Sequence, residues 1–274
     1  MRPTFVVLIF VTILAVLGCV SCSPHFDSSV SVSSSLPTLR SAFLFDTFRL
    51  VQTNPETAQS SVLNFLYRGG EPRTAPLSHD FAWDTMQFFF WEKAYGVVAF
   101  PKEYHVLDVC LLDPNHTYQG MDIEMEKSFW QEHPQNGTFY GLWTLLGENT
   151  NPFDVPYEKR IVMMGNYTKW NVDQLYERVP EIRELMNGEC LGGSVPCFVY
   201  VHCEQGKDRS GELIGAYAME YMGFTLQKAM QWNEEIAGRQ MEQTYWNGMA
   251  WYCFYLQQTS IPSIDCTMPT RAFN

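Results

Sequence analysis

Residues 199–221 read VYVHCEQGKDRSGELIGAYAMEY, and the order of residue types in this stretch indicates the fold. An apolar run that favours a strand leads into His202 and Cys203, a polar turn follows with Gly206 inside it, and a helical pattern begins beside Ser210. The stretch therefore predicts a strand, a tight loop and a helix in direct succession. A loop that closes onto a helix N-terminus directs successive backbone N–H groups inward, which favours an anion of phosphate size.

The side chains of this loop suit phosphate chemistry. The field of the loop lowers the pKa of a cysteine at its base, so Cys203 would supply a thiolate nucleophile. Arg209 offers a planar fork to two phosphate oxygens, and Gly206 lets the backbone approach a ligand closely. The Ser210 hydroxyl would stabilise the sulfur as it leaves, and His202 would steady the loop. The alternative for Cys203 is a disulfide half-cystine that happens to precede an arginine.

The pattern HCEQGKDRS, residues 202–210, matches the signature H-C-x5-R-[ST] and so resembles the cysteine-dependent phosphatases: protein tyrosine, dual-specificity, phosphoinositide and phytase-type enzymes. LYRGGEP at 66–72 is similar to an early strand and turn of the dual-specificity-like members. The helical pattern before VYVHC is similar to the helix that precedes their motif strand. The resemblance covers about residues 60–258. It implies a tyrosine-phosphatase-like, three-layer α/β fold in a single domain, with a central mixed sheet flanked by helices.

The resemblance implies a phosphomonoesterase that works through a phosphocysteine intermediate and needs no metal or cofactor. In this interpretation Cys203 attacks phosphorus, Arg209 binds the phosphate group and Ser210 assists departure of the thiolate. The implied phosphate-binding residues are Glu204, Gln205, Gly206, Lys207, Asp208 and Arg209. A Walker nucleotide loop is excluded, because GKDRS lacks the pattern G-x4-G-K-[ST].

The general acid is the part of the family pattern that this sequence lacks. The resemblance places it near MMGNYTKW (163–170), which contains no aspartate and has Asn166 there instead. Asp208 is one candidate, because myotubularins and Sac-type phosphoinositide phosphatases also carry C-x4-D-R-[ST]; its alternative role is to fix Arg209 or face solvent. Asp173 is the other candidate. It falls in the first turn of the next predicted helix, where an acid is also expected for helix-dipole reasons.

The sequence leaves the substrate open. Phosphotyrosine or phosphoserine/threonine proteins, phosphoinositides and inositol phosphates all fit the signature, although the mixed loop charges argue against a many-phosphate ligand such as phytate. A catalytically weak pseudophosphatase that only captures phosphate groups is an alternative from another class. A disulfide-stabilised domain without a phosphate site is a third. The net charge of −12 argues against nucleic acid and anionic membrane surfaces as partners.

The N-terminus indicates secretion. Arg2 is followed by an apolar run over 4–17 and then by small residues, which is typical of a secretory signal peptide. A signal anchor and a bacterial lipoprotein signal at Cys19 are the alternatives. We expect a glycoprotein that is secreted or held in a secretory or lysosomal lumen, without a stable membrane span after signal cleavage. Three sequons favour a eukaryotic secretory route and begin at Asn115, Asn136 and Asn166.

The cysteines predict two disulfides and two free thiols. Eight cysteines are present, and six of them lie beyond the predicted signal. An even number in an oxidising compartment suggests bridges, but Cys203 must stay free for the proposed chemistry. Cys110, in an apolar strand, is then the buried odd thiol. The pairs that we expect are Cys190 with Cys197 and Cys253 with Cys266.

Strands and helices are predicted to alternate along one domain. The parts are a signal peptide (1–22), a serine-rich lead-in (23–40), a phosphatase-like domain (41–262) with an irregular insertion (113–160), and a C-terminal tail (263–274). The predicted strands lie within 62–72, 96–100, 104–113, 159–167 and 197–203. The predicted helices lie within 78–96, 171–189, 210–223, 225–239 and 243–258.

Overall fold

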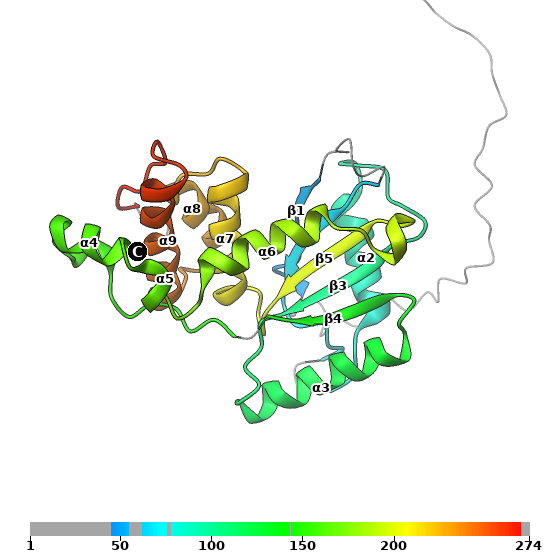
Figure 1. The fold of residues 1–274 in the computed structure, drawn as a ribbon. Helices are drawn as coiled ribbons and strands as arrows, with labels where there is room; N and C mark the ends of the chain where they lie inside the picture. The colour runs from blue at the N-terminus through cyan, green and yellow to red at the C-terminus, as the bar shows by residue number, and fades with distance from the viewer. Residues whose placement is uncertain (1–44, 55–61, 76–77, 143, 270–274) are drawn as a thin grey trace, which may run out of the picture. The chain divides into compact units, whose positions relative to one another are not determined.

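The structure is a computed structural model that describes residues 45–54, 62–75, 78–142 and 144–269 (Figure 1). The chain divides into two units, residues 1–36 and 37–274, and every described residue belongs to the second. The predicted signal peptide (1–22) and serine-rich lead-in (23–40) lie outside the described residues. Within the described part of the chain, no helix combines the length and the apolar composition that a membrane crossing requires.

Five strands of the described residues form one mixed sheet in the order β1-β2-β5-β3-β4 (Figure 1). Strand β1 is antiparallel to β2, and the other neighbouring pairs are parallel. The central strand, β5, has the sequence CFVYVH and is buried along its whole length, as expected for a parallel strand covered on both faces. The strands are β1 (Arg49–Thr53), β2 (Phe65–Gly69), β3 (His105–Cys110), β4 (Gly137–Gly141) and β5 (Cys197–His202).

Helices cover both faces of this sheet. One face packs against α2 (Trp83–Ala94) and α3 (Thr117–Glu132). The other face packs against α6 (Leu175–Asn187) and α7 (Arg209–Tyr221), and α8 (Leu226–Ala237) and α9 (Gln243–Thr259) pack on α7. The predicted three-layer α/β fold with a central mixed sheet is therefore confirmed.

Side chains of β5 alternate between these two layers. Phe198 and Tyr200 join an aromatic core with residues of α2, whereas Val199 and Val201 join the core beneath α6 to α9. The same alternation continues to the end of the strand. It directs His202 toward the α2 and α3 layer and Cys203 toward the α6 to α9 layer, where Cys203 belongs to the core.

The prediction of an irregular insertion over 113–160 is wrong. This segment contains α3 and β4, and β4 forms the edge of the sheet beside β3. The sequence pattern does not predict helix α3, because polar side chains occupy its buried face. Gln119, Asp122 and Glu126 are all buried there, so the apolar residues do not recur at the spacing that marks an amphipathic helix.

Two predicted strands are also wrong. Residues 159–167 belong to helices α4 (Tyr157–Met164) and α5 (Tyr167–Trp170), because a short apolar run fits either a helix or a strand. Residues 96–100 form no strand; they continue the turn that ends α2. Two short 3-10 helices, at Pro152–Asp154 and Leu191–Gly193, complete the described elements.

The expected cysteine pattern is confirmed. Disulfides join Cys190 to Cys197 and Cys253 to Cys266, and the two other cysteines of the described residues are buried free thiols. The second disulfide ties the predicted tail to α9. Ile264 and Cys266 are buried there, so residues at the start of the predicted tail join the core.

Candidate active site

The candidate site is the loop between β5 and α7. Cys203 follows the last residue of β5 and is only 3% exposed, and Arg209 is the first residue of α7. Ser210, in the first turn of α7, is fully buried. The predicted succession of strand, loop and helix is thus present, and it brings Cys203, Arg209 and Ser210 to one end of the central strand.

Four successive carbonyl groups of the loop are bonded to groups outside it. Because the C=O and the following N–H of a trans peptide point in opposite directions, this arrangement turns the N–H groups of residues 205–208 away from those partners. None of the described peptide bonds is cis. The carbonyls and their donors are Glu204 with Glu71 N (3.2 Å), Gln205 with Thr47 Oγ1 (2.8 Å), Gly206 with Arg68 Nη2 (2.7 Å) and Lys207 with Asn233 Nδ2 (3.2 Å).

Gly206 is required by the shape of the loop. Its φ is +69°, and an added Cβ would collide with the side chain of Thr47 and with the backbone of Gly69 at the end of β2. Both facts exclude an L side chain here. The glycine therefore lets the loop pass directly over the end of β2, where Arg68 reaches its carbonyl.

The surroundings of Cys203 favour the thiolate. Burial raises the pKa of the thiol, but Arg209, the Ser210 side chain and the backbone N–H groups of Ser210 and Gly206 lower it, and the net pKa lies below the usual 9.0. Arg68 adds a further cation behind the loop. Burial lowers the pKa of Arg68 to about 10, which leaves the guanidinium charged at neutral pH.

Arg209 is held by partners from three other segments of the chain. Its Nη1 donates to the carbonyl oxygen of Leu111 (2.9 Å), to Gln119 Oε1 (3.0 Å) and to Thr144 Oγ1 (3.3 Å). These partners follow β3, lie on α3 and follow β4 respectively. Its Nη2 lies 3.9 Å from Glu204 Oε2, which in turn accepts a hydrogen bond from Gln119 Nε2. The guanidinium is thus oriented before any ligand arrives, as a phosphate fork requires.

Asp208, the first candidate acid, is already engaged. Its two oxygens accept hydrogen bonds from both terminal nitrogens of Arg239, and Oδ1 also accepts from the backbone N–H of Glu242 (2.9 Å). The side chain is 15% exposed. In this arrangement the carboxylate links the loop to the segment between α8 and α9, and neither oxygen is free.

Asp173, the second candidate acid, lies before α6 and not in its first turn, because that helix begins at Leu175. It is 1% exposed, and its two oxygens accept the backbone N–H groups of Leu146 and Gly147, each at 2.7 Å. Burial raises the pKa of Asp173, and these two hydrogen bonds oppose the rise. Asn166, where the resemblance places an acid, is exposed and lies before α5.

His202 faces away from Cys203, on the other side of β5. It is fully buried, and its Nε2 lies 3.1 Å from Asp108 Oδ1 and 3.5 Å from Glu126 Oε2. Burial lowers the pKa of the imidazole, but Glu126, Cys110 and Asp108 raise it, and their effect prevails. The space behind the loop therefore favours positive charge.

A cavity of about 310 Å³ adjoins the loop at Glu204 and is also lined by Gln119 of α3. His116 and Tyr118 border it with exposed rings whose centroids lie 6.1 Å apart. Its inner wall contains the ion pair of Arg73 with Asp122, in which Nη1 and Oδ2 are 3.3 Å apart, and Asp122 also contacts His79 at 2.8 Å. The opening beside the loop between β5 and α7 is therefore aromatic at its rim and mixed in charge inside.

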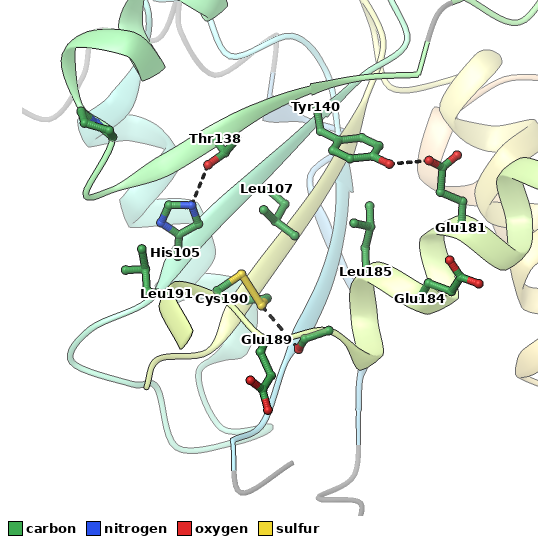
Figure 2. Close-up of a pocket in the computed structure, with 13 residues that line it drawn as sticks. His105, Leu107, Thr138, Tyr140, Glu181, Glu184, Leu185, Glu189, Cys190 and Leu191 are labelled. Carbon is green, nitrogen blue, oxygen red and sulfur yellow. Dashed lines mark hydrogen bonds between the residues drawn. A yellow bond between two sulfur atoms is a disulfide. The ribbon is translucent and has the colours of Figure 1, made fainter. Parts of the chain in front are cut away.

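A second cavity, of about 540 Å³, lies at the opposite end of the strands (Figure 2). Its lining includes His105 and Cys197, the first residues of β3 and β5, with Thr138, Tyr140 and Glu181. Hydrogen bonds join His105 to Thr138 and Tyr140 to Glu181 (Figure 2). No residue from 203 to 210 lines this cavity, so it is separate from the loop between β5 and α7.

Sequence reasoning missed the residues that hold the loop from outside. Arg68 carried a usable signal, because an arginine inside the apolar run FLYRG needs a buried partner. Asn233 carried a weaker one as a polar residue on the buried face of α8. No sequence pattern indicates the roles of Thr47 and Gln119, since these roles depend on how distant elements pack.

Comparisons with known proteins add little to this geometry. No model of a known family matches the chain, and no curated protein matches it. Among solved structures, one described as "Structure of Siw14 catalytic core" aligns with 75% of this chain and 90% of its own, at 15% identity and a TM-score of 0.30. A match at that score supports no argument about the site.

Proposed function

We propose that this protein is a cysteine-dependent phosphomonoesterase that acts through a phosphocysteine intermediate. The observation that carries the proposal is the set of four anchored carbonyls at residues 204–207, which leaves the opposite N–H groups for an anion above Cys203. A cysteine whose pKa is lowered by Arg209 and Ser210 lies at the base of that loop. A structural half-cystine would need neither feature.

The reaction has two steps in this proposal. The Cys203 thiolate attacks phosphorus, a sulfur–phosphorus bond forms, and the bond between phosphorus and the ester oxygen breaks. Water then attacks the phosphocysteine, the sulfur–phosphorus bond breaks, and inorganic phosphate leaves. Arg209 and the loop backbone hold the phosphate oxygens through both steps. The Ser210 hydroxyl stabilises the departing thiolate.

The leaving oxygen needs a proton from a nearby acid. Asp208 and Asp173 are the proposed acids, but both oxygens of each are engaged by other groups. Asp208 is nearer to the chemistry, since it adjoins Arg209, and it would have to leave Arg239 to donate a proton. Substrates with a stable leaving group need little such help.

The substrate that fits these constraints best is an aryl phosphate, as in phosphotyrosine. The exposed rings of His116 and Tyr118 at the adjoining cavity suit a flat aromatic group. A phosphorylated protein is accordingly the proposed partner, with phosphoinositides and inositol phosphates as the alternatives. We place this activity in a secreted protein or a secretory lumen, on the strength of the N-terminal pattern and the two disulfides.

A substrate panel tests the proposal. The full chain is assayed on an aryl phosphate, a phosphotyrosine peptide, a phosphoserine peptide, a phosphoinositide and phytate, with a chelator present. We expect the aryl phosphate and the phosphotyrosine peptide to react fastest, and acid quenching to trap phosphate on Cys203. Absence of turnover on every substrate by a folded protein would overturn the proposed enzyme.

A pseudophosphatase is the second candidate, and the engagement of both aspartates favours it. Such a protein would bind phosphate at the same loop without turnover. Calorimetric titration with inorganic phosphate separates the cases: binding without turnover of the aryl phosphate supports the pseudophosphatase. Loss of binding in Arg209→Ala would show that the measured site is this loop.

A further inference from the structure

A second group of reactive side chains lies behind the phosphate loop and has no part in the mechanism above. Cys110 ends β3 and is paired in register with His202 at the end of β5, so the two side chains project from the same face of the sheet. Glu126 reaches them from α3. Ligand atoms of Cys110, Glu126 and His202 all lie within 4.8 Å of one another, and the three side chains are at most 2% exposed.

The polar atoms of this group are poorly satisfied. Neither oxygen of Glu126 and neither ring nitrogen of His202 makes a well-aligned hydrogen bond with any described residue, although all four atoms are buried. Buried polar groups without such bonds are destabilising unless something else compensates them. A positive ion at their centre would be bound by all three side chains.

The surrounding ionisable groups are predominantly carboxyls. Asp108 lies beside His202, with its Oδ2 fixed by Trp130 Nε1 (2.7 Å) and its Oδ1 without a hydrogen bond. Glu71 is also buried nearby and interacts with Glu126; its Oε2 lies 3.3 Å from Arg73 Nε. Arg73 is shared with Asp122, so it does not neutralise the group around His202.

We propose that Cys110, His202 and Glu126 bind a structural zinc ion behind the phosphate loop. Sulfur, imidazole and carboxylate ligands together suit zinc, whereas magnesium and calcium prefer oxygen ligands only. Asp108 orients His202 or supplies a fourth ligand, as carboxylates beside metal-bound histidines commonly do. The ion would fasten β3 and β5 to α3 and so support Leu111 and Cys203. It has no role in the phosphocysteine steps, and the sequence predicted no metal.

Metal content tests this assignment independently of activity. The full chain is expressed in zinc-supplemented medium, treated with chelator and analysed for zinc by mass spectrometry. We expect about one zinc per chain, and a loss of roughly tenfold or more in Cys110→Ser and Glu126→Gln. Matched controls are Cys203→Ser, the other free thiol, and Glu212→Gln, another buried carboxyl without a hydrogen bond; both should retain zinc.

Cobalt provides a readout that survives misfolding of the variants. Wild-type protein from cobalt-supplemented cells should show the near-ultraviolet charge-transfer absorption of a thiolate–cobalt bond, and the spectrum should persist in Cys203→Ser. The competing account is a buried ion pair only, with an imidazolium between Asp108 and Glu126. Trace zinc in folded wild type, no cobalt–thiolate absorption, or full zinc in folded Cys110→Ser would each overturn the zinc site, while leaving the proposed phosphatase untouched.

Discussion

The two free thiols of the described residues, Cys110 and Cys203, lie at the ends of the adjacent strands β3 and β5, but their electrostatic surroundings differ. Both are buried, at 2% and 3% exposure. Burial raises the pKa of Cys110, and Glu126 raises it further. At Cys203 the same burial is outweighed by Arg209, Ser210 and two backbone N–H groups. Neighbouring charge, and not exposure, therefore accounts for the opposite pKa shifts of the two thiols.

The end of β5 borders two different environments. The consecutive residues His202 and Cys203 project to opposite faces of the strand. One face meets donors that attract an anion, and the other meets carboxylates that attract a cation. The end of β5 thus places a positive and a negative environment back to back.

Replacing Cys203 should have the largest effect. Cys203→Ser is expected to lower kcat by at least about 10⁴-fold, because a serine hydroxyl is far less ionised at neutral pH. Turnover of an aryl phosphate is the measurement, and calorimetric binding of inorganic phosphate is the control for an intact loop. If the serine variant keeps substantial activity after contaminating phosphatases are excluded, Cys203 is not the nucleophile.

Alkylation should distinguish the two thiols in a single sample. We expect iodoacetamide to label Cys203 at least roughly 10²-fold faster than Cys110, because neighbouring groups lower the pKa of Cys203 whereas burial and Glu126 raise that of Cys110. Peptide mapping by mass spectrometry follows both sites over time, and inorganic phosphate should slow labelling of Cys203. Equal alkylation rates at Cys203 and Cys110 would show that the neighbouring groups do not make Cys203 the more reactive thiol.

Arg209→Lys should lower kcat/KM by about 10²- to 10³-fold, because a point charge cannot replace the planar fork. It should also slow alkylation of Cys203. Arg160→Lys is the matched control. Arg160 packs on the ring of Phe254 and lines a cavity that contains no residue of the loop from 203 to 210. If both lysine variants behave alike, the role of Arg209 is structural.

Asp208→Asn tests the acid with a smaller expected effect. If Asp208 protonates the leaving oxygen, alkyl phosphates should slow by roughly 10²-fold and aryl phosphates much less. If Asp208 only ties the loop to Arg239, both substrates should slow equally and Arg239→Gln should reproduce the loss. Asp173→Asn, measured on the same two substrates, decides whether that residue has the role instead.

The smallest expected effect concerns stability. Burial raises the pKa of Glu212 well above its usual 4.5, and Asp173 and Glu148 raise it further. The folded state then holds protons that the unfolded state releases, so the free energy of unfolding should fall as the pH rises above 4.5. We expect this fall to be measurable between about pH 5 and pH 9.

Denaturant unfolding at several pH values measures this loss. Glu212→Gln should flatten the dependence, because an amide does not ionise. Glu220→Gln is a suitable control from the same helix, since Glu220 is only half-buried and accepts a hydrogen bond from Tyr252. An unchanged slope in Glu212→Gln would show that another group controls the pH dependence.

Sequence predicted the fold wherever local pattern and tertiary environment agree. The run CFVYVH and the helix that follows were found because apolar residues mark both. Helix α3 was missed because its buried face holds Gln119, Asp122 and Glu126, whose partners come from distant segments. The disulfides were found because each closes a short loop, 7 and 13 residues apart.

The candidate site was predicted only as far as one contiguous motif reaches. Cys203, Arg209 and Ser210 meet because they are neighbours in the chain. The fixation of Asp208 by Arg239 and of Asp173 by Leu146 and Gly147 depends on packing between separate elements. No spacing rule encodes such partners, so a sequence offers acid candidates without showing which oxygens are free.

The close approach of Gly206 to the end of β2 constrains how this chain can evolve. An L residue at 206 would meet both Thr47 and the backbone of Gly69, so a substitution there must be accompanied by a rearranged strand end. Descendants under selection for phosphate binding should therefore keep this glycine even where surrounding loop residues diverge. Copies that retain Cys203 and Arg209 but accept a bulkier residue at 206 would mark lineages in which the loop has been released from that selection.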